Sequence, residues 1–231
     1  NTGIGASSFG FSGSSHSLTG SYNTALGSES MFYNSSGSNN TGVGYKTLYQ
    51  NSIGSYNTAL GSESMIALPG SNNTGVGYKA LHNTGGSYNT AIGAQALPAT
   101  GSYGSNNTAI GYLSLKTLTS GHRNVAIGNE TLNRLTSQTD NTFIGHQAGL
   151  YGATLYSTAI GSKSLQGRST SGGGSYSTAI GYQALQYPGY NSEYNIAVGY
   201  NAFRGSTSNN GIGKYNIGIG TNTLSVNQGN Y

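Results

Sequence analysis

One five-residue motif recurs along the whole chain and restricts the folds open to it. It reads N-T-A-I-G at residues 89–93, and its final glycine serves as the anchor of each repeat. The thirteen anchors are Gly5, Gly27, Gly44, Gly61, Gly77, Gly93, Gly111, Gly128, Gly145, Gly161, Gly181, Gly199 and Gly220. Successive anchors are 16 to 22 residues apart, and the 215 residues from first to last make 12 steps of about 18 residues. This period is too short for the common helical repeats and suits a coil of two short strands.

We therefore expect an all-β fold, a parallel β-solenoid of about thirteen turns with 16–22 residues each. Gly, Ser, Asn and the three prolines gather between the motifs, where we expect loops along one edge. Residues 1–231 should form a single uninterrupted repeat array without a capping or anchor domain. Such an array is expected to be open-ended.

Residues at equivalent positions of successive turns form columns, and each column has its own chemistry. The residue before the anchor is always Ile, Leu or Val, and the residue three before it is Thr in ten turns. Val125, Ile196 and Ile217 take the place of Thr in the other three turns. Branched side chains at alternating positions are typical of a packed strand surface. We predict that these two columns fill the interior.

Two more columns are expected to complete the core. The residue four before the anchor is Asn, or Ser at Ser157 and Ser177, and should form a stacked ladder that bonds to neighbouring turns. A second apolar column lies four after the anchor, and Gly149 interrupts it, with Leu150 as the expected replacement. The column comprises Phe9, Met31, Leu48, Met65, Leu81, Leu97, Leu115, Leu132, Leu165, Leu185, Phe203 and Leu224.

The residue two before the anchor is Ala or Gly in twelve of the thirteen turns. If its neighbours face inward, this column faces outward, where small size suggests the close approach of another chain. A tight bend within one chain is the alternative. The subunit interface predicted on this basis comprises Ala91, Ala109, Ala126, Phe143, Ala159 and Ala179. The ring of Phe143, the exception, should then lie between subunits, whereas in a monomer it should be exposed or lie inside its own coil.

Charged residues make up only 6% of the chain, and they are too few and too scattered to indicate an active site. Glu29, Lys46, Glu63 and Lys79 occupy one column, two after the anchor, where we expect a ladder of alternating charge. The four histidines lack metal-ligand spacing and there is no cysteine, so no catalytic, cofactor or metal site is expected. Basic runs and long apolar stretches are also absent from the sequence, which argues against nucleic acid and direct membrane insertion as partners.

Two sets of surface residues could carry binding or modification. Tyrosines one residue after the anchor form a candidate contact column for glycans, although they could simply pack on one another: Tyr45, Tyr78, Tyr112, Tyr182 and Tyr200. N-x-[ST] sequons, candidate sites of N-glycosylation, occur at Asn34, Asn39, Asn72, Asn106 and Asn129.

The sequences N-T-A-I-G-x-x-A-L at residues 89–97 and S-T-A-I-G-Y-Q-A-L at residues 177–185 resemble the head repeats of YadA-like trimeric autotransporter adhesins. Similar repeats occur in phage and viral tail-fibre proteins. The resemblance spans the chain and implies a left-handed parallel β-roll, a homotrimer, and attachment to host-surface glycans or matrix. The family's repeat is typically shorter, so longer loops are expected here.

These observations favour a non-enzymatic extracellular fibre or adhesin head at a cell or virion surface. A subunit of an end-to-end filament or tail fibre is the alternative. A glycan-binding module and an ice-binding solenoid are further possibilities, the latter because a threonine ladder can present ordered hydroxyls. Val and Ile in the threonine column argue that the column is buried, and therefore against ice binding.

Overall fold

The computed structural model describes residues 1–10, 18–67, 70–83, 85–98, 104–134, 136–151, 154–168, 173–189, 191–205 and 212–225. Within these residues the protein is an all-β parallel β-solenoid, which confirms the predicted fold class. Each motif forms one three-residue strand that ends directly before the anchor glycine. The expected second strand of each turn is instead a run of turn conformations, in which no named strand occurs among the described residues.

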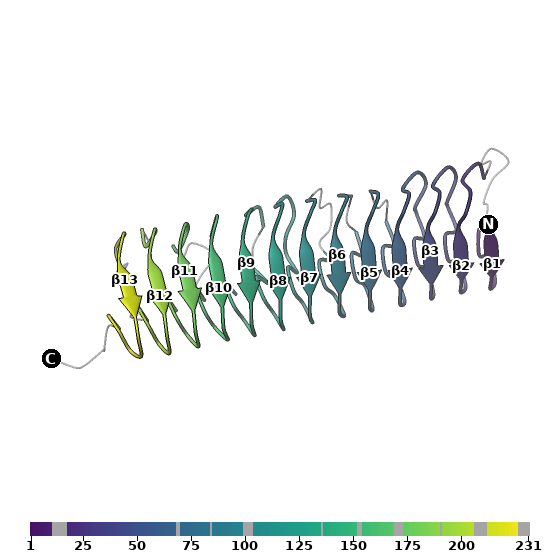
Figure 1. Cartoon of the computed structure of the whole chain (residues 1–231). Coiled ribbons are helices and arrows are strands. Elements are labelled where there is room, and N and C mark those ends of the chain that lie inside the picture. The colour runs from purple at the N-terminus through teal and green to yellow at the C-terminus, as the bar shows by residue number, and fades with distance from the viewer. Residues whose placement is uncertain are drawn as a thin grey trace. The chain divides into compact units, whose positions relative to one another are not determined.

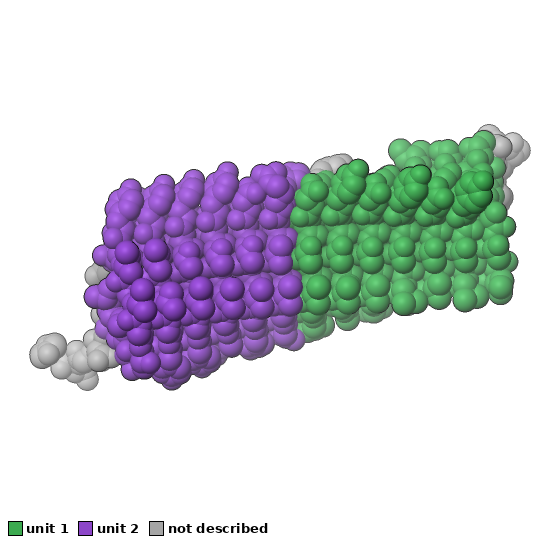
Figure 2. Space-filling view, viewed as in Figure 1, with its two compact units in different colours: residues 1–113 green, residues 114–231 purple. Residues whose placement is uncertain are grey.

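The chain divides into two compact units, residues 1–113 and 114–231 (Figure 2). Unit 1 contains β1 (Thr2–Ile4), β2 (Thr24–Leu26), β3 (Thr41–Val43), β4 (Thr58–Leu60), β5 (Thr74–Val76), β6 (Thr90–Ile92) and β7 (Thr108–Ile110). Unit 2 contains β8 (Val125–Ile127), β9 (Thr142–Ile144), β10 (Thr158–Ile160), β11 (Thr178–Ile180), β12 (Ile196–Val198) and β13 (Ile217–Ile219).

Within each unit, successive strands lie side by side in chain order and pair in parallel (Figure 1). The register is the one that the motif predicts: Thr24 pairs with Thr41, and Leu26 pairs with Val43. Loops of different length therefore leave the strand register unchanged. As a result, equivalent side chains form regular rows along each unit (Figure 2).

The strands face the opposite way from the sequence-based prediction. Ala59, at the centre of β4, is fully buried, whereas Thr58 and Leu60 on either side of it are exposed. The other strands in the body of each unit repeat this pattern, with a buried central residue between more exposed neighbours. The prediction that the Thr and Ile/Leu/Val columns fill the interior is therefore wrong.

The physical reason is that each turn is too narrow to hold a branched side chain from the strand. A Cβ added to Gly42 in β3 would lie 2.8 Å from both Ser30 Oγ and Thr47 Oγ1. These two residues each lie three positions after an anchor glycine, in the segment of the turn that lies opposite the strand and that we name the facing arm. At Gly42 even the methyl group of Ala would press on these two oxygens, and the other turns hold Ala or Gly at this position, with Phe143 as the exception. The large apolar side chains come from the facing arm instead, where Met31 and Leu48 are fully buried, as predicted for that column.

Phe143 shows that the interior of a turn has room for one large side chain, whether the strand or the facing arm supplies it. Its ring is fully buried within its own turn, and the arm that faces it carries Gly149 in place of Leu or Met. A Cβ on Gly149 would lie 2.5 Å from Phe143 Cε1 and 2.7 Å from Leu132 Cδ2. The interruption at Gly149 is thus a volume exchange with Phe143, while the neighbouring Leu150 is also buried.

The anchor glycines adopt a backbone conformation that side chains disfavour, and they also touch one another. Gly61 has φ of +120°, and a Cβ added to it would lie 2.8 Å from the carbonyl atoms of Gly77 in the next turn. The facing arm then passes through the left-handed region at two ordinary residues, such as Glu63 (φ +57°) and Met65 (φ +51°). This repeated geometry folds each arm back beneath its strand.

The predicted asparagine ladder is confirmed and lies buried at the corner that leads into each strand. Asn57 donates a hydrogen bond from Nδ2 to the Gly70 carbonyl (2.8 Å), and its Oδ1 accepts one from the Asn73 backbone N–H (2.9 Å). Serine replaces asparagine within the same ladder, where Ser157 Oγ accepts from the Ser177 N–H (3.3 Å). The side-chain ladder therefore satisfies backbone groups that the short strands leave unpaired.

Candidate interaction surfaces

The outer side of the strands in each unit carries exposed aliphatic side chains. It consists of the columns three and one before the anchor, which together we name the Thr/aliphatic face. Ile or Leu side chains stay at least a third exposed there at Leu26 (44%), Leu60 (47%), Ile92 (40%), Ile160 (39%) and Ile180 (39%). Neither column contains a charged residue. Contiguous exposed apolar surface of this kind is typical of an interaction site.

The predicted subunit interface along the Ala/Gly column is wrong. Each of its residues is fully buried inside its own coil, so none can meet a second chain: Ala91, Ala109, Ala126, Phe143, Ala159 and Ala179. The cause of their small size is the tight packing of one chain on itself. This was the alternative reading of the column.

The candidate tyrosine column, one residue after the anchor, lies on the surface. Its exposed fractions range from 42% at Tyr182 to 52% at Tyr200, and these two rings stack at 5.5 Å. That pair fits the simple packing explanation. In unit 1, by contrast, two of the rings lie close to a cation of their own turn: Lys46 Nζ is 5.1 Å from the Tyr45 ring centroid, and Lys79 Nζ is 5.1 Å from that of Tyr78.

A second tyrosine column, five residues before the anchor, was missed at the level of sequence. In unit 2 it forms a continuous ladder of four rings, Tyr156, Tyr176, Tyr194 and Tyr215, with centroids 4.8–5.2 Å apart. The recurring G-S-Y-N sequence carried the signal, because its tyrosine always precedes the ladder asparagine. In unit 1 the same column alternates between tyrosine and asparagine.

The charged column two residues after the anchor is brought together as predicted. Lys46 Nζ lies 3.5 Å from Glu29 Oε2, and Lys79 Nζ lies 3.4 Å from Glu63 Oε2. The charges pair two by two. A hydrogen bond with Tyr45 and the nearby Glu29 carboxylate raise the pKa of Lys46. Partly exposed pairs of this kind contribute little to stability, because water and salt screen them.

A stronger ion pair in unit 2 was not anticipated. Arg123 donates from Nε and Nη2 to the two carboxylate oxygens of Asp140, at 2.6 and 2.7 Å, from adjacent turns. The hydrogen bond from Arg123 lowers the pKa of Asp140 below its ordinary value. Both residues belong to the column five before the anchor, so at these two turns an ion pair takes the position that tyrosine holds elsewhere.

The five sequons differ in their accessibility. Asn34 is buried, and its Nδ2 donates to the Gly37 carbonyl at 3.1 Å, so its amide is not available for glycosylation. The other four asparagines, Asn39, Asn72, Asn106 and Asn129, are exposed.

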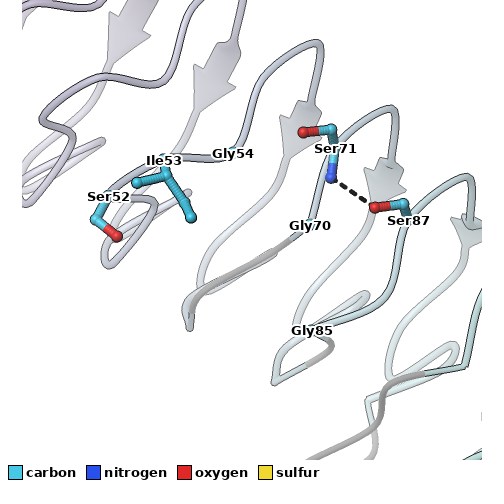
Figure 3. Close-up of a pocket in the computed structure, with 7 residues that line it drawn as sticks. All are labelled: Ser52, Ile53, Gly54, Gly70, Ser71, Gly85 and Ser87. Carbon is cyan, nitrogen blue, oxygen red and sulfur yellow. Dashed lines mark hydrogen bonds between the residues drawn. The ribbon is translucent and has the colours of Figure 1, made fainter.

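A hollow of about 320 Å³ lies in unit 1 among the loops that precede the strands. It is lined by Ser52, Ile53, Gly54, Gly70, Ser71, Gly85 and Ser87 (Figure 3). The Ser87 hydroxyl accepts a hydrogen bond from the Ser71 N–H at 3.0 Å. No ionisable side chain lines the hollow, which therefore offers space and hydroxyls rather than acid–base chemistry.

Across the described part of the chain, no three His, Asp or Glu side chains come together in a way that could hold a metal ion. The same residues include no helix with the length and hydrophobicity to cross a bilayer.

Comparison with known proteins gives no match: no family model, no curated protein and no solved structure is significantly similar to this chain.

Proposed function

We propose that the protein is a non-enzymatic, extracellular repeat protein in which copies of the chain associate lengthwise to form a fibre or an adhesin head. The observation that carries this proposal is the Thr/aliphatic face. Exposed Leu60, Ile92 and Ile160 are members of a column that is Ile, Leu or Val in every turn, without an interrupting charge. Leaving such a column in water costs free energy, and association of copies through it would remove that cost.

The resemblance to YadA-like head repeats supports the same proposal and favours a homotrimer. The contact between copies then runs through the Thr/aliphatic face and not through the buried Ala/Gly column. Matched strands give each turn the same contact, so the association strengthens with every added turn. Attachment to host glycans or matrix, at a cell or virion surface, would use the other faces of the coil. An end-to-end filament or tail-fibre subunit is the alternative assembly.

Mass in solution tests the association. We expect light scattering to give a multiple of the chain mass of 23.6 kDa, and three times that value for the homotrimer. The double variant Ile160→Glu/Ile180→Glu places two charges on the Thr/aliphatic face and should reduce the mass to that of one chain. Lys163→Glu is the matched control, because it adds negative charge to the column two after the anchor and should leave the mass unchanged. A wild-type protein of 23.6 kDa at micromolar concentration would refute the proposal.

Ice binding is a second candidate, and one finding favours it. From the sequence, the threonine column is predicted to be buried, which argues against ice binding. In the structure Thr24, Thr41 and Thr58 are exposed and pair in register on adjacent strands. The register places these threonines in one regular row beside the aliphatic column. Thermal hysteresis that is lost in Thr41→Lys/Thr58→Lys would support ice binding. Ice growth that is unaffected by millimolar wild-type protein would exclude it.

A further inference from the structure

The column five residues before the anchor differs between the two units, and in unit 1 it alternates between tyrosine and asparagine. Its consecutive members are Tyr22, Asn39, Tyr56, Asn72 and Tyr88, each on the turn after the previous one. Backbone hydrogen bonds of 2.9–3.1 Å fix each turn to the one before it at this column. All five residues share the same left-handed φ of +57° to +61°. Tyrosine and asparagine therefore occupy equivalent, rigid positions in strict alternation.

The stacked ladder in unit 2 shows what this column looks like when every position is a tyrosine. Ring centroids lie 5.2 Å apart for Tyr156 and Tyr176, and 4.8 Å apart for Tyr176 and Tyr194, with planes within 14° of parallel. Each inner ring covers the faces of its neighbours. Tyr176 and Tyr194 are consequently only 44% and 41% exposed.

The three tyrosines of this column in unit 1 stack on no other ring among the residues that the structure describes. Tyr56 and Tyr88 are each 62% exposed, and Tyr22 is 81% exposed. Alternate turns of a parallel coil are roughly 9.6 Å apart, which is twice the strand spacing. A ring placed midway between two of these tyrosines would lie about 4.8 Å from each, the spacing seen within the unit 2 ladder. The asparagine at that turn has a shorter side chain than tyrosine, and both Asn39 and Asn72 are exposed.

We propose that the two slots, between Tyr22 and Tyr56 and between Tyr56 and Tyr88, each bind one pyranose ring of a neutral, β-linked glycan. The proposal rests on the adhesive role proposed above and identifies the class of its ligand. A β-linked glucose-type ring carries C–H groups on both faces, which pack on the two flanking tyrosines, and equatorial hydroxyls at its edge. Asn39 and Asn72 can both donate to and accept from these hydroxyls.

Two features favour a sugar over an aromatic side chain of a peptide. The base of each slot is a neutral amide, which suits hydroxyl groups, and an apolar floor would suit an aromatic ring better. In addition, the 320 Å³ hollow is lined by Ser71 and Ser87, which directly precede Asn72 and Tyr88 in the chain (Figure 3).

Calorimetric titration of the full chain with cellohexaose and with chitohexaose tests this proposal. We expect saturable binding of at least one of them, weakened about tenfold or more by Tyr56→Asn, which removes one wall of both slots. This variant should fold normally, because asparagine already occupies the column at Asn39 and Asn72 with the same φ. Tyr156→Asn at the start of the closed ladder is the matched control: its neighbours in the column are Asp140 and Tyr176, so it opens no slot between two tyrosines, and it should bind like the wild type.

A second variant makes the test independent of lost contacts. Asn39→Tyr/Asn72→Tyr fills both open places and converts the column into a closed ladder, so glycan binding should disappear while the thermal midpoint stays equal or rises. Three results would overturn the proposal: no saturable binding of either hexasaccharide, binding that is unchanged in Tyr56→Asn, or binding of a tyrosine-containing peptide in place of the sugars. Because the slots lie outside the Thr/aliphatic face, these results are read separately from the mass in solution that tests association.

Discussion

At the scale of single residues, the fold depends on exchanges of volume and of hydrogen bonds within and between turns. Phe143 and Gly149 are the clearest case, because the only large residue of the Ala/Gly column is faced by the glycine of the opposite column. All other turns combine a small strand residue with a larger residue on the arm. The same total volume is thus distributed in two ways.

This exchange predicts a rescue. Phe143→Ala should destabilise the protein by about 3–5 kcal/mol, since it leaves a cavity that the rigid coil cannot close. Gly149→Leu alone should also destabilise it, by overpacking against the ring. The double variant restores the pattern of neighbouring turns, whose leucines adopt a similar φ, and should recover most of the loss. Urea unfolding measures all three, and additive losses in the double variant would contradict the account.

The asparagine ladder predicts a graded response at one position. Asn57→Ala removes the acceptor of the buried Asn73 N–H and the donor to the Gly70 carbonyl, and should cost about 1–3 kcal/mol. Asn57→Ser should cost less, because serine already serves this ladder at Ser157. Thermal unfolding of the two variants gives the order, and equal losses would argue that the ladder hydrogen bonds contribute little.

At the scale of elements, the sequence was sufficient for the positions and register of the strands but not for the direction in which they face. The motif placed every strand correctly, because its period and its anchor glycine are local properties of the chain. Alternation of side chains, however, separates the two faces of a strand without saying which one lies inside. In the Thr-Ala-Ile strands, the branched Thr and Ile side chains were predicted to face inward because they suit a packed strand surface. The width of the turn decides instead which side chains face inward, and this width depends on the residues of the facing arm.

The same reasoning explains which surface residues could be predicted. The Glu29–Lys46 pair follows from column position alone, since adjacent turns bring equivalent residues together. The proposed glycan slots could not be predicted from column position alone, because their identification needs the ring spacing and the exposed fractions of the stacked tyrosines in unit 2. Likewise, the burial of Asn34 depends on the path of a loop, which the motif does not specify.

The Arg123–Asp140 pair links neighbouring turns and predicts a dependence on pH. Since the pair lowers the pKa of Asp140 in the folded state, its contribution is present above the ordinary pKa of about 3.9 and is lost as the pH falls through the lower folded value. Asp140→Asn should therefore flatten the decline in thermal midpoint below about pH 4. At pH 7 the effect should be small, because the pair is exposed and screened by salt. Parallel melting curves for both proteins from pH 7 to pH 2 test this.

At the scale of the whole molecule, we propose that different columns of each coil serve different functions. The Thr/aliphatic face is assigned to contact between copies of the chain, and the tyrosine column beside it to a glycan. The buried Ala/Gly column and the asparagine ladder hold successive turns in register. Because each turn contributes the same elements, substitutions in equivalent positions of different turns should have similar effects, except at turns such as that of Phe143.

Cysteine crosslinking at two adjacent residues of β10 tests the central claim most directly, since the protein has no cysteine of its own. Ile160 lies on the Thr/aliphatic face, whereas Ala159 lies inside the coil. We expect Ile160→Cys to form disulfide-linked chains on mild oxidation, and Ala159→Cys to remain uncrosslinked and unreactive to maleimide until the protein is unfolded. Crosslinking through Ala159→Cys but not through Ile160→Cys would contradict the account, as would the absence of crosslinking from both.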